Sequence, residues 1–221
     1  MNIIFSFIIF LMFVSACGIS VKTKINAYRL QSVDYNAGIC VIGVGNNIAL
    51  NEELTNKIVK ILQSKKNINV VQDCHKADYI LAFNYSIKGD KYTYTFYIPM
   101  QSRETVYGNI YGDIQGWFSA SSTKTEYLPV YGQKVVYYRY ILFILVDKRT
   151  LKEKQIKPVW QLEISSVGKT GDLRTISDYL LVPLYKYFLK DTKRQIDLII
   201  DEDDPTLKQL KQVLYGSGKQ S

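Results

Sequence analysis

Large apolar residues and smaller polar residues alternate in two consecutive stretches near the middle of the chain. Tyrosine, leucine, phenylalanine and isoleucine recur at every second position in residues 79–87, and again in residues 92–98. This period of two is typical of β-strands that bury one face. Gly89-Asp90 lies between the stretches, and a Gly-X pair favours a tight type II′ turn. The pattern therefore predicts a β-hairpin with all its large residues on one face.

Two other segments have the helical period instead. Asn51 and Asp172 are the predicted N-caps of these helices, since a short polar side chain can accept a hydrogen bond from the first turn. The first apolar stripe consists of Leu54, Ile58, Ile61 and Leu62, and the second of Leu173, Ile176, Leu180, Leu184, Tyr187 and Phe188. Pro183 is expected to kink the second helix.

Short apolar segments predict the remaining strands at residues 33–44, 68–71, 135–147, 158–167 and 194–200. Residues 141–146 are apolar at every position, which indicates a strand covered on both faces. The last of these segments is expected to be an edge strand. The element order predicts an α+β fold: a single antiparallel-rich β-sheet with two helices packed on one face.

The chain begins with an apolar run that ends at Ala16. Its length suits a signal-peptide core better than a membrane span, which needs about 20 apolar residues. Val14-Ser15-Ala16-Cys17 resembles the lipobox of bacterial lipoproteins. The resemblance implies signal-peptidase recognition at Val14, Ser15 and Ala16, and lipidation of Cys17 by diacylglycerol and an acyl chain such as palmitate. The alternative is an ordinary secretory signal followed by an unrelated cysteine.

These observations divide the chain into a signal peptide (1–16), a tether (17–32), an α+β periplasmic domain (33–200) and an acidic run with a polar, partly helical tail (201–221). The acidic run lacks the D-x-D-x-D spacing of a calcium loop, so a solvated acidic patch is expected. Gly18 follows the cysteine instead of the aspartate that retains many lipoproteins in the inner membrane. By this resemblance, the outer membrane and its periplasmic face are favoured.

Residues 99–133 are predicted to form a long Tyr/Gly-rich loop inside the domain. Loops of this length are uncommon in compact domains unless they have a function. The loop therefore predicts a binding site for a glycan, a partner protein or a bilayer surface, whose candidate residues are Tyr107, Tyr111, Trp117, Tyr127 and Tyr131. The alternative is an irregular connection whose tyrosines pack on the core.

The chain has 28 Lys and Arg against 20 Asp and Glu, a formal net charge of +8. This charge suits an anionic envelope component as a partner, although scattered lysines also occur on any solvated surface. Nucleic acid is not an expected partner, because the chain has no recognition motif and begins with an export signal.

Candidate catalytic and metal-binding residues are few. Cys40 and Cys74 either form a disulfide or remain two free thiols. His75 is the single histidine, and no second Cys/His cluster accompanies Cys74-His75. No G-x-S-x-G, H-E-x-x-H or P-loop motif occurs. The sequence therefore predicts no cofactor, no metal and no enzyme activity; a periplasmic hydrolase is the least favoured alternative.

Four short motifs also resemble an uncharacterised family of bacterial lipoproteins, the domain of unknown function 4136. They are Ala77-Asp78-Tyr79, Leu145-Val146-Asp147, Pro158-Val159-Trp160-Gln161 and Gly171-Asp172-Leu173. The resemblance implies a fold and an envelope location, without an activity. We expect a lipid-anchored, non-catalytic envelope lipoprotein with a structural or binding role. The alternative is a lipoprotein that inserts into a membrane or forms oligomers through residues 99–133.

Overall fold

The computed structural model describes residues 19–34, 37–110, 116–153 and 158–216, with only the backbone described for residues 102–110, 116–124 and 152–153. The chain divides into two compact units. We call residues 1–89 and 136–221 the core domain, and residues 90–135 the ribbon.

The described strands form one mixed sheet in the order β3-β2-β4-β5-β6-β1-β7. The strands are β1 (Val21–Arg29), β2 (Gly38–Gly43), β3 (Asn69–Val70), β4 (Tyr79–Ile110), β5 (Gly116–Asp147), β6 (Pro158–Gly168) and β7 (Ile196–Ile200). β2 is parallel to β3 and β4, whereas β1 is antiparallel to β6 and β7, and β5 to β6. The position of β7 at the edge of the sheet confirms that prediction.

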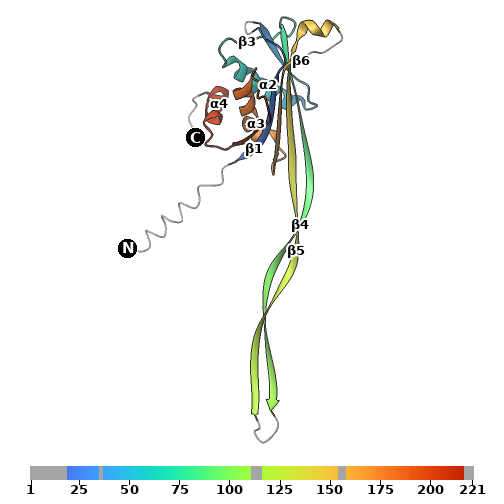
Figure 1. Ribbon diagram of the computed structural model, residues 1–221, viewed down its shortest axis with the longest axis vertical. Coiled ribbons are helices and arrows are strands. Elements are labelled where there is room, and N and C mark those ends of the chain that lie inside the picture. Colours follow the sequence, from blue (N-terminus) through green and yellow to red (C-terminus); the bar gives the residue numbers. More distant parts are fainter. Residues whose placement is uncertain (1–18, 35–36, 111–115, 154–157, 217–221) are drawn as a thin grey trace, which may run out of the picture. The chain divides into compact units, whose positions relative to one another are not determined.

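Three α-helices cover one face of the sheet in the core domain (Figure 1). They are α2 (Ile48–Gln63), α3 (Leu173–Tyr187) and α4 (Pro205–Tyr215), and a short 3-10 helix, η1 (Lys148–Glu153), follows β5. The α+β class and the helical face are therefore as expected. The helix expected in part of the polar tail is α4, and it differs from the expectation in joining the core: Asp204 caps it by accepting hydrogen bonds from the backbone of Thr206 and Leu207, and Leu207, Leu210 and Leu214 are buried.

The predicted helix stripes form the core. Leu54, Ile58, Ile61 and Leu62 of α2 are buried, as are Leu173, Ile176, Leu180 and Leu184 of α3. Trp160 of β6 is fully buried, packs edge-on against Phe188 and donates its indole N–H to the carbonyl of Lys190 at 2.9 Å. Satisfying this polar group lets the largest side chain of the core be buried without an unpaired donor.

Of the two predicted helix N-caps, one is confirmed and the other is wrong. Asp172 caps α3 as predicted, with its carboxylate accepting from the Arg174 N–H at 2.9 Å. The N-cap of α2 is Asn47, whose side chain accepts from Leu50 N–H, so the prediction of Asn51 was wrong by one turn. Asn51 instead donates its side-chain amide to the carbonyl of Gly45 at 2.6 Å and fixes the loop before the helix.

The predicted tether contains a strand. β1 lies between β6 and β7, and its buried positions are Val21, Thr23, Ile25 and Ala27. Threonine and alanine make this alternation weak in the sequence, which explains why it was not recognised. The strand expected at residues 33–44 is β2, which is shorter and spans Gly38–Gly43.

One face of the sheet is open. Phe143 and Leu145 of β5 are buried under the helices, whereas Leu142 and Ile144 on the other face are only half-buried. The prediction that residues 141–146 are covered on both sides was therefore wrong.

The largest difference concerns the predicted hairpin and the predicted long loop. Gly89-Asp90 is not a turn: β4 continues through it to Ile110, and β5 begins at Gly116. The segment 99–133 is therefore mostly the paired halves of two 32-residue strands. The large residues change from odd to even positions across Gly89-Asp90, which a two-residue turn would place on one face; in the continuous strand they lie on opposite faces.

Candidate interaction surface

The ribbon has one face of aromatic and aliphatic side chains. The ring of Tyr94 lies over Gly132, where a Cβ atom would be only 2.5 Å from Tyr94 Cζ. Tyr94 also stacks on Phe96, with ring centroids 6.1 Å apart. These three residues therefore share a face. Because side chains alternate along a strand, the same face also carries Ile98, Met100, Leu128 and Val130.

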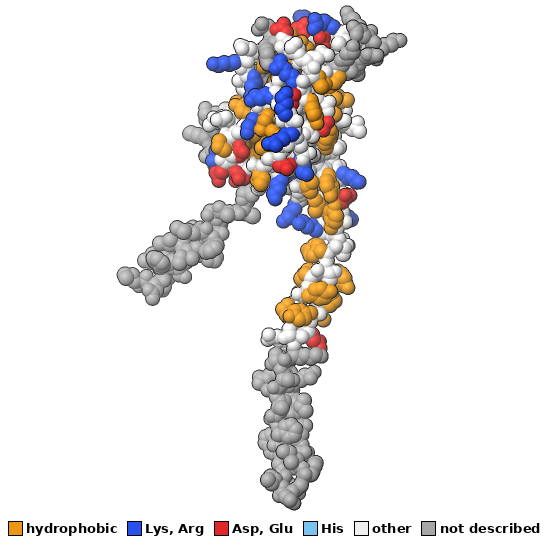
Figure 2. Space-filling view, viewed as in Figure 1, with side chains coloured by type: hydrophobic (Ala, Val, Ile, Leu, Met, Phe, Trp, Pro, Cys, Tyr) orange, Lys and Arg blue, Asp and Glu red, His pale blue; other side chains and the backbone are white. Residues whose placement is uncertain are grey.

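Large side chains on this apolar face are exposed, although they are of the kind that normally forms a core. Phe96 is 43% exposed, Ile98 42% and Met100 52%. Figure 2 shows hydrophobic side chains following one another along the described part of the ribbon. A two-stranded ribbon alone is only marginally stable in water, and exposed apolar patches of this kind mark interaction sites.

The opposite face of the ribbon is formed by threonine and tyrosine. Thr93, Thr95 and Tyr97 lie on it in β4, and the predicted residues Tyr127 and Tyr131 lie on it in β5. Tyr127 is 65% exposed and Tyr131 73% exposed. Their exposure contradicts the alternative in which these tyrosines pack on the core. A binding role for them stays a prediction.

Several predicted site residues lie outside the described part of the chain. They are Val14, Ser15, Ala16, Cys17 and Tyr111, together with the side chains of Tyr107 and Trp117. The apolar face, in contrast, includes residues that the sequence reasoning assigned to a buried hairpin face: Tyr94, Phe96 and Ile98. The large residues are odd-numbered before Gly89 and even-numbered after it, so in one continuous strand these residues lie on the face opposite to that of Phe83.

A second surface lies on the open face of the sheet in the core domain. It is a shallow groove of about 550 Å³ over β1, β6 and β7, lined by Lys22, Lys24, Val167, Asp197 and Ile199. Val167 and Ile199 are exposed. The groove combines apolar side chains with both signs of charge, so its charge does not select one class of ligand.

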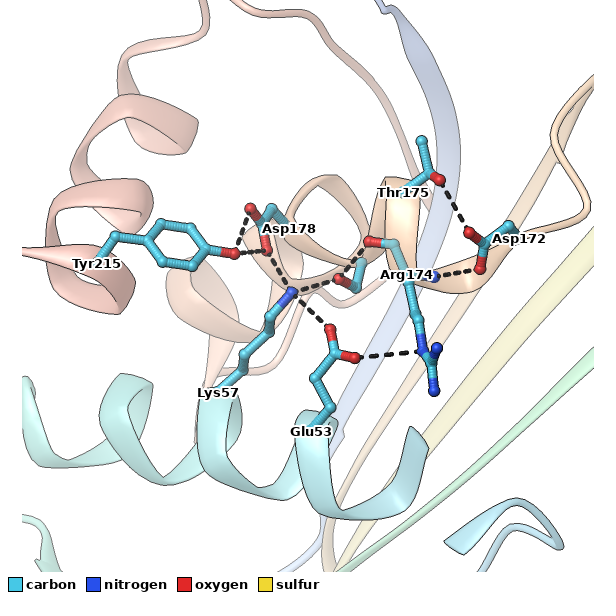
Figure 3. A network of polar contacts seen from close by, with 8 residues as sticks. Glu53, Lys57, Asp172, Arg174, Thr175, Asp178 and Tyr215 are labelled. Atoms are coloured by element: carbon cyan, nitrogen blue, oxygen red, sulfur yellow. Dashed lines mark hydrogen bonds and ion pairs between the residues drawn. The ribbon is translucent and has the colours of Figure 1, made fainter. Parts of the chain in front are cut away.

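A polar cluster connects the three helices (Figure 3). Lys57 of α2 donates to Ser177 Oγ at 2.7 Å and to Asp178 Oδ1 at 3.0 Å, and its Nζ lies 3.3 Å from Glu53 Oε1. Tyr215 of α4 donates to Asp178 at 2.9 Å. Each charged group named here has a partner, so the cluster joins the three helices.

The pKa values in this cluster reflect the same contacts. Burial lowers the pKa of Lys57, but the hydrogen bond and the negative charge of Asp178 outweigh burial and raise it above its ordinary value. Burial and the charge of Asp178 both raise the pKa of Tyr215. Both shifts favour the protonated forms, which are the forms that make these hydrogen bonds.

Two further buried charges lie elsewhere in the core domain. Arg139 donates to the carbonyl of Thr170 at 3.0 Å and to Ser166 Oγ at 3.4 Å, and burial lowers its pKa. Asp147 accepts hydrogen bonds from Arg149, which lower the pKa of the carboxyl group. Both buried charged groups are therefore hydrogen-bonded to neighbouring residues of the core domain.

Cys40 and Cys74 form a disulfide, with their Cα atoms 5.2 Å apart. This decides between the two alternatives left open by the sequence, and it is consistent with an extracytoplasmic location. In the described ranges, no group of three or more His, Cys, Asp or Glu residues could hold a metal ion. No helix among the residues described is long and apolar enough to cross a membrane.

Comparisons with known proteins give only distant likenesses. No family model and no curated protein matches the chain, so the resemblance to the lipoprotein family stays an expectation. Among solved structures, the chain is similar to a PelC dodecamer from Paraburkholderia phytofirmans, with 9% identity, a TM-score of 0.38, and coverage of 74% of this chain and 97% of that chain. It is also similar to a PDZ domain protein from Parabacteroides distasonis, with 15% identity, a TM-score of 0.34, and coverage of 87% of this chain but only 42% of that one.

Proposed function

We propose that this protein is a lipid-anchored, non-catalytic protein of the bacterial envelope whose ribbon is its interaction element. The observation that supports this most is the apolar face of Tyr94, Phe96, Ile98, Met100 and Leu128, which is exposed along the ribbon. Burying such a face contributes about 25 cal/mol per Å² of apolar area, so the ribbon gains stability when a partner covers it.

Other features support the envelope location and the absence of catalysis. The lipobox ends at Cys17, and the Cys40–Cys74 disulfide suits an oxidising compartment. Asp147 is the single buried carboxylate among the described residues, and Arg149 holds it. A hydrolase would need an acid and a base that converge on a cleft. In the polar cluster, the charged side chains instead make hydrogen bonds and ion pairs that join one helix to another.

The test compares the anchor and the ribbon in the cell that produces the protein. Intact mass should show that the mature chain starts at Cys17 with added diacylglycerol and acyl chains, and Cys17→Ser should abolish the lipid. In isolated envelopes, trypsin should fail to cut after Lys91 and Lys134, whereas it should cut both sites in purified protein that is diluted until it is monomeric. Equal cleavage in envelopes and in solution would refute the ribbon as the interaction element.

A matched pair of variants separates binding from folding. Phe96→Ser removes an apolar side chain from the interaction face and should restore cleavage in envelopes. Thr95→Ser changes the opposite face and should leave the protection unchanged. If both variants behave alike, the apolar face is not the part that is covered.

A further inference from the structure

The ribbon has two strand edges that no other described strand pairs with. β2 pairs with β4 only at residues 79–83, and β6 pairs with β5 only at Tyr137–Val146. Along residues 90–110 the outer edge of β4 therefore has no neighbour in the described part of the chain, and neither has the outer edge of β5 along residues 116–135. Such edges are templates for pairing with another strand.

The direction of the backbone groups on β4 can be assigned. Val44 N–H donates to the carbonyl of Phe83 at 2.8 Å, so the backbone groups of Phe83 point toward β2 and away from β5. Backbone groups point to opposite sides at successive residues. Pro99 lies an even number of residues after Phe83, so its missing N–H also belongs to the outer edge. Thr93 and Thr95 share this parity and present their N–H and C=O groups outward.

Pro129 gives the corresponding assignment on β5, because proline is tolerated in a strand where its missing N–H faces an unpaired edge. Thr125, Tyr127 and Tyr131 have the same parity as Pro129 and therefore point outward. Each proline removes one donor from its edge. The outward groups on either side of it remain able to pair, but each edge already has one gap in its ladder, so a second missing donor within four residues of the first should prevent stable pairing.

These edges indicate what kind of partner fits. A lipid surface has no groups that continue a β-ladder, so the partner at an edge is a peptide strand. Ribbons that lie side by side in the same orientation bring the outer edge of β4 of one copy next to the outer edge of β5 of the next, and these strands then run in opposite directions, as antiparallel pairing requires. We propose that the ribbons of several copies of this chain pair edge to edge, with β4 of one copy beside β5 of the next, in a head-to-tail assembly.

Head-to-tail pairing uses both edges of every ribbon, whereas a twofold β4–β4 pair leaves both β5 edges open. Head-to-tail contacts form a ring where the rotation between copies closes. The apolar faces of neighbouring ribbons then lie side by side. The inference rests on the proposed role of the ribbon and names its partner as a second copy of the same chain.

The test uses the full lipidated chain in mild detergent, with mass measured by light scattering. Thr95→Pro removes an outward N–H from β4, and Tyr131→Pro removes one from β5. Thr95→Ala and Tyr131→Ala keep these N–H groups and are the matched controls. The wild type and both alanine variants should form assemblies of more than two copies, and each proline variant alone should be a monomer.

Mixing the two proline variants provides the decisive measurement. Each keeps one intact edge, so the mixture should form a 1:1 heterodimer and nothing larger. Dimers of Tyr131→Pro alone would indicate β4–β4 pairing and overturn the head-to-tail arrangement. A monomeric wild type would overturn self-assembly altogether.

Folding and membrane binding are followed separately. Circular dichroism should give the same thermal transition of the core domain in all four variants. In vesicles holding fewer than one chain each, the outward amides of the ribbon should exchange with deuterium as fast as in the monomer. Protection under these conditions would mean that lipid covers the ribbon and would overturn the proposal. Protection from trypsin in envelopes without self-assembly would preserve the proposed function and refute only this inference.

Discussion

Replacing Lys57 with methionine tests whether the polar cluster fixes the three helices. Methionine keeps most of the side-chain volume but removes the ammonium group that joins Ser177 and Asp178. Hydrogen bonds to charged groups contribute about 1.5–3 kcal/mol each, and breaking a fully buried ion pair costs about 3–5 kcal/mol. The side chains of Lys57 and Asp178 are 13% and 16% exposed, so water compensates part of the loss.

We therefore expect Lys57→Met to lower the free energy of unfolding by about 2 kcal/mol. In a domain of this size, that corresponds to a fall in melting temperature of about 4–8 °C. Urea unfolding followed by the fluorescence of Trp160 measures it, in a Trp117→Phe background because the chain has two tryptophans. In a double-mutant cycle with Asp178→Asn, the coupling energy should be at least about 1 kcal/mol.

The matched control is Lys208→Met. Lys208 lies 2.8 Å from Asp203, which is shorter than the Lys57–Asp178 distance, but both side chains of this pair are exposed to solvent. Exposed pairs contribute little, so no measurable change is expected. If Lys57→Met destabilises the protein no more than Lys208→Met does, burial does not determine the strength of these pairs and the reasoning fails.

The remaining predictions concern the disulfide, pH and packing. Reduction of Cys40–Cys74, which spans 34 residues, should lower the free energy of unfolding by about 3–4 kcal/mol in denaturant titrations with and without reductant. The raised pKa of Tyr215 means that its contribution is complete below pH 10 and lost as pH rises through the folded pKa, so Tyr215→Phe should flatten the loss of stability at alkaline pH. A Cβ atom at Gly43 would be 2.8 Å from Phe83 Cζ, so Gly43→Ala should destabilise the core domain by about 1–3 kcal/mol in thermal melts.

The sequence predicted the helices best, because their apolar stripes consist of large aliphatic residues at a regular spacing. Leu54, Ile58 and Ile61 are all buried, and Asp172 caps α3 as expected. A helix stripe is a local signal: the burial of each residue follows from its neighbours in the sequence. The strand predicted at residues 158–167 is observed as β6, Pro158–Gly168.

The ribbon was not predicted, because its decisive feature is not local. Gly89-Asp90 favours a turn, and glycines such as Gly132 suggested a loop. In the structure, Gly132 is the residue over which the Tyr94 ring lies, so the glycine supports the strand pair instead of interrupting it. Whether a chain turns at Gly89 depends on the strand that pairs with it from a distant part of the sequence, and single-sequence patterns do not contain that information.

The start of β1 changes what the proposed anchor would do. With a tether of residues 17–32, the domain could move over about 50 Å from a lipid on Cys17. Because β1 begins at Val21, the chain from Cys17 to the sheet spans at most about 14 Å. By the same measure the exposed Lys22 and Lys24 on β1 lie at most about 18 and 25 Å from Cys17, which is roughly two to three Debye lengths, so their attraction to anionic head groups should be strongest at low ionic strength. The anchor would therefore hold the core domain against the membrane surface, and the charge of this strand would contribute to its orientation there.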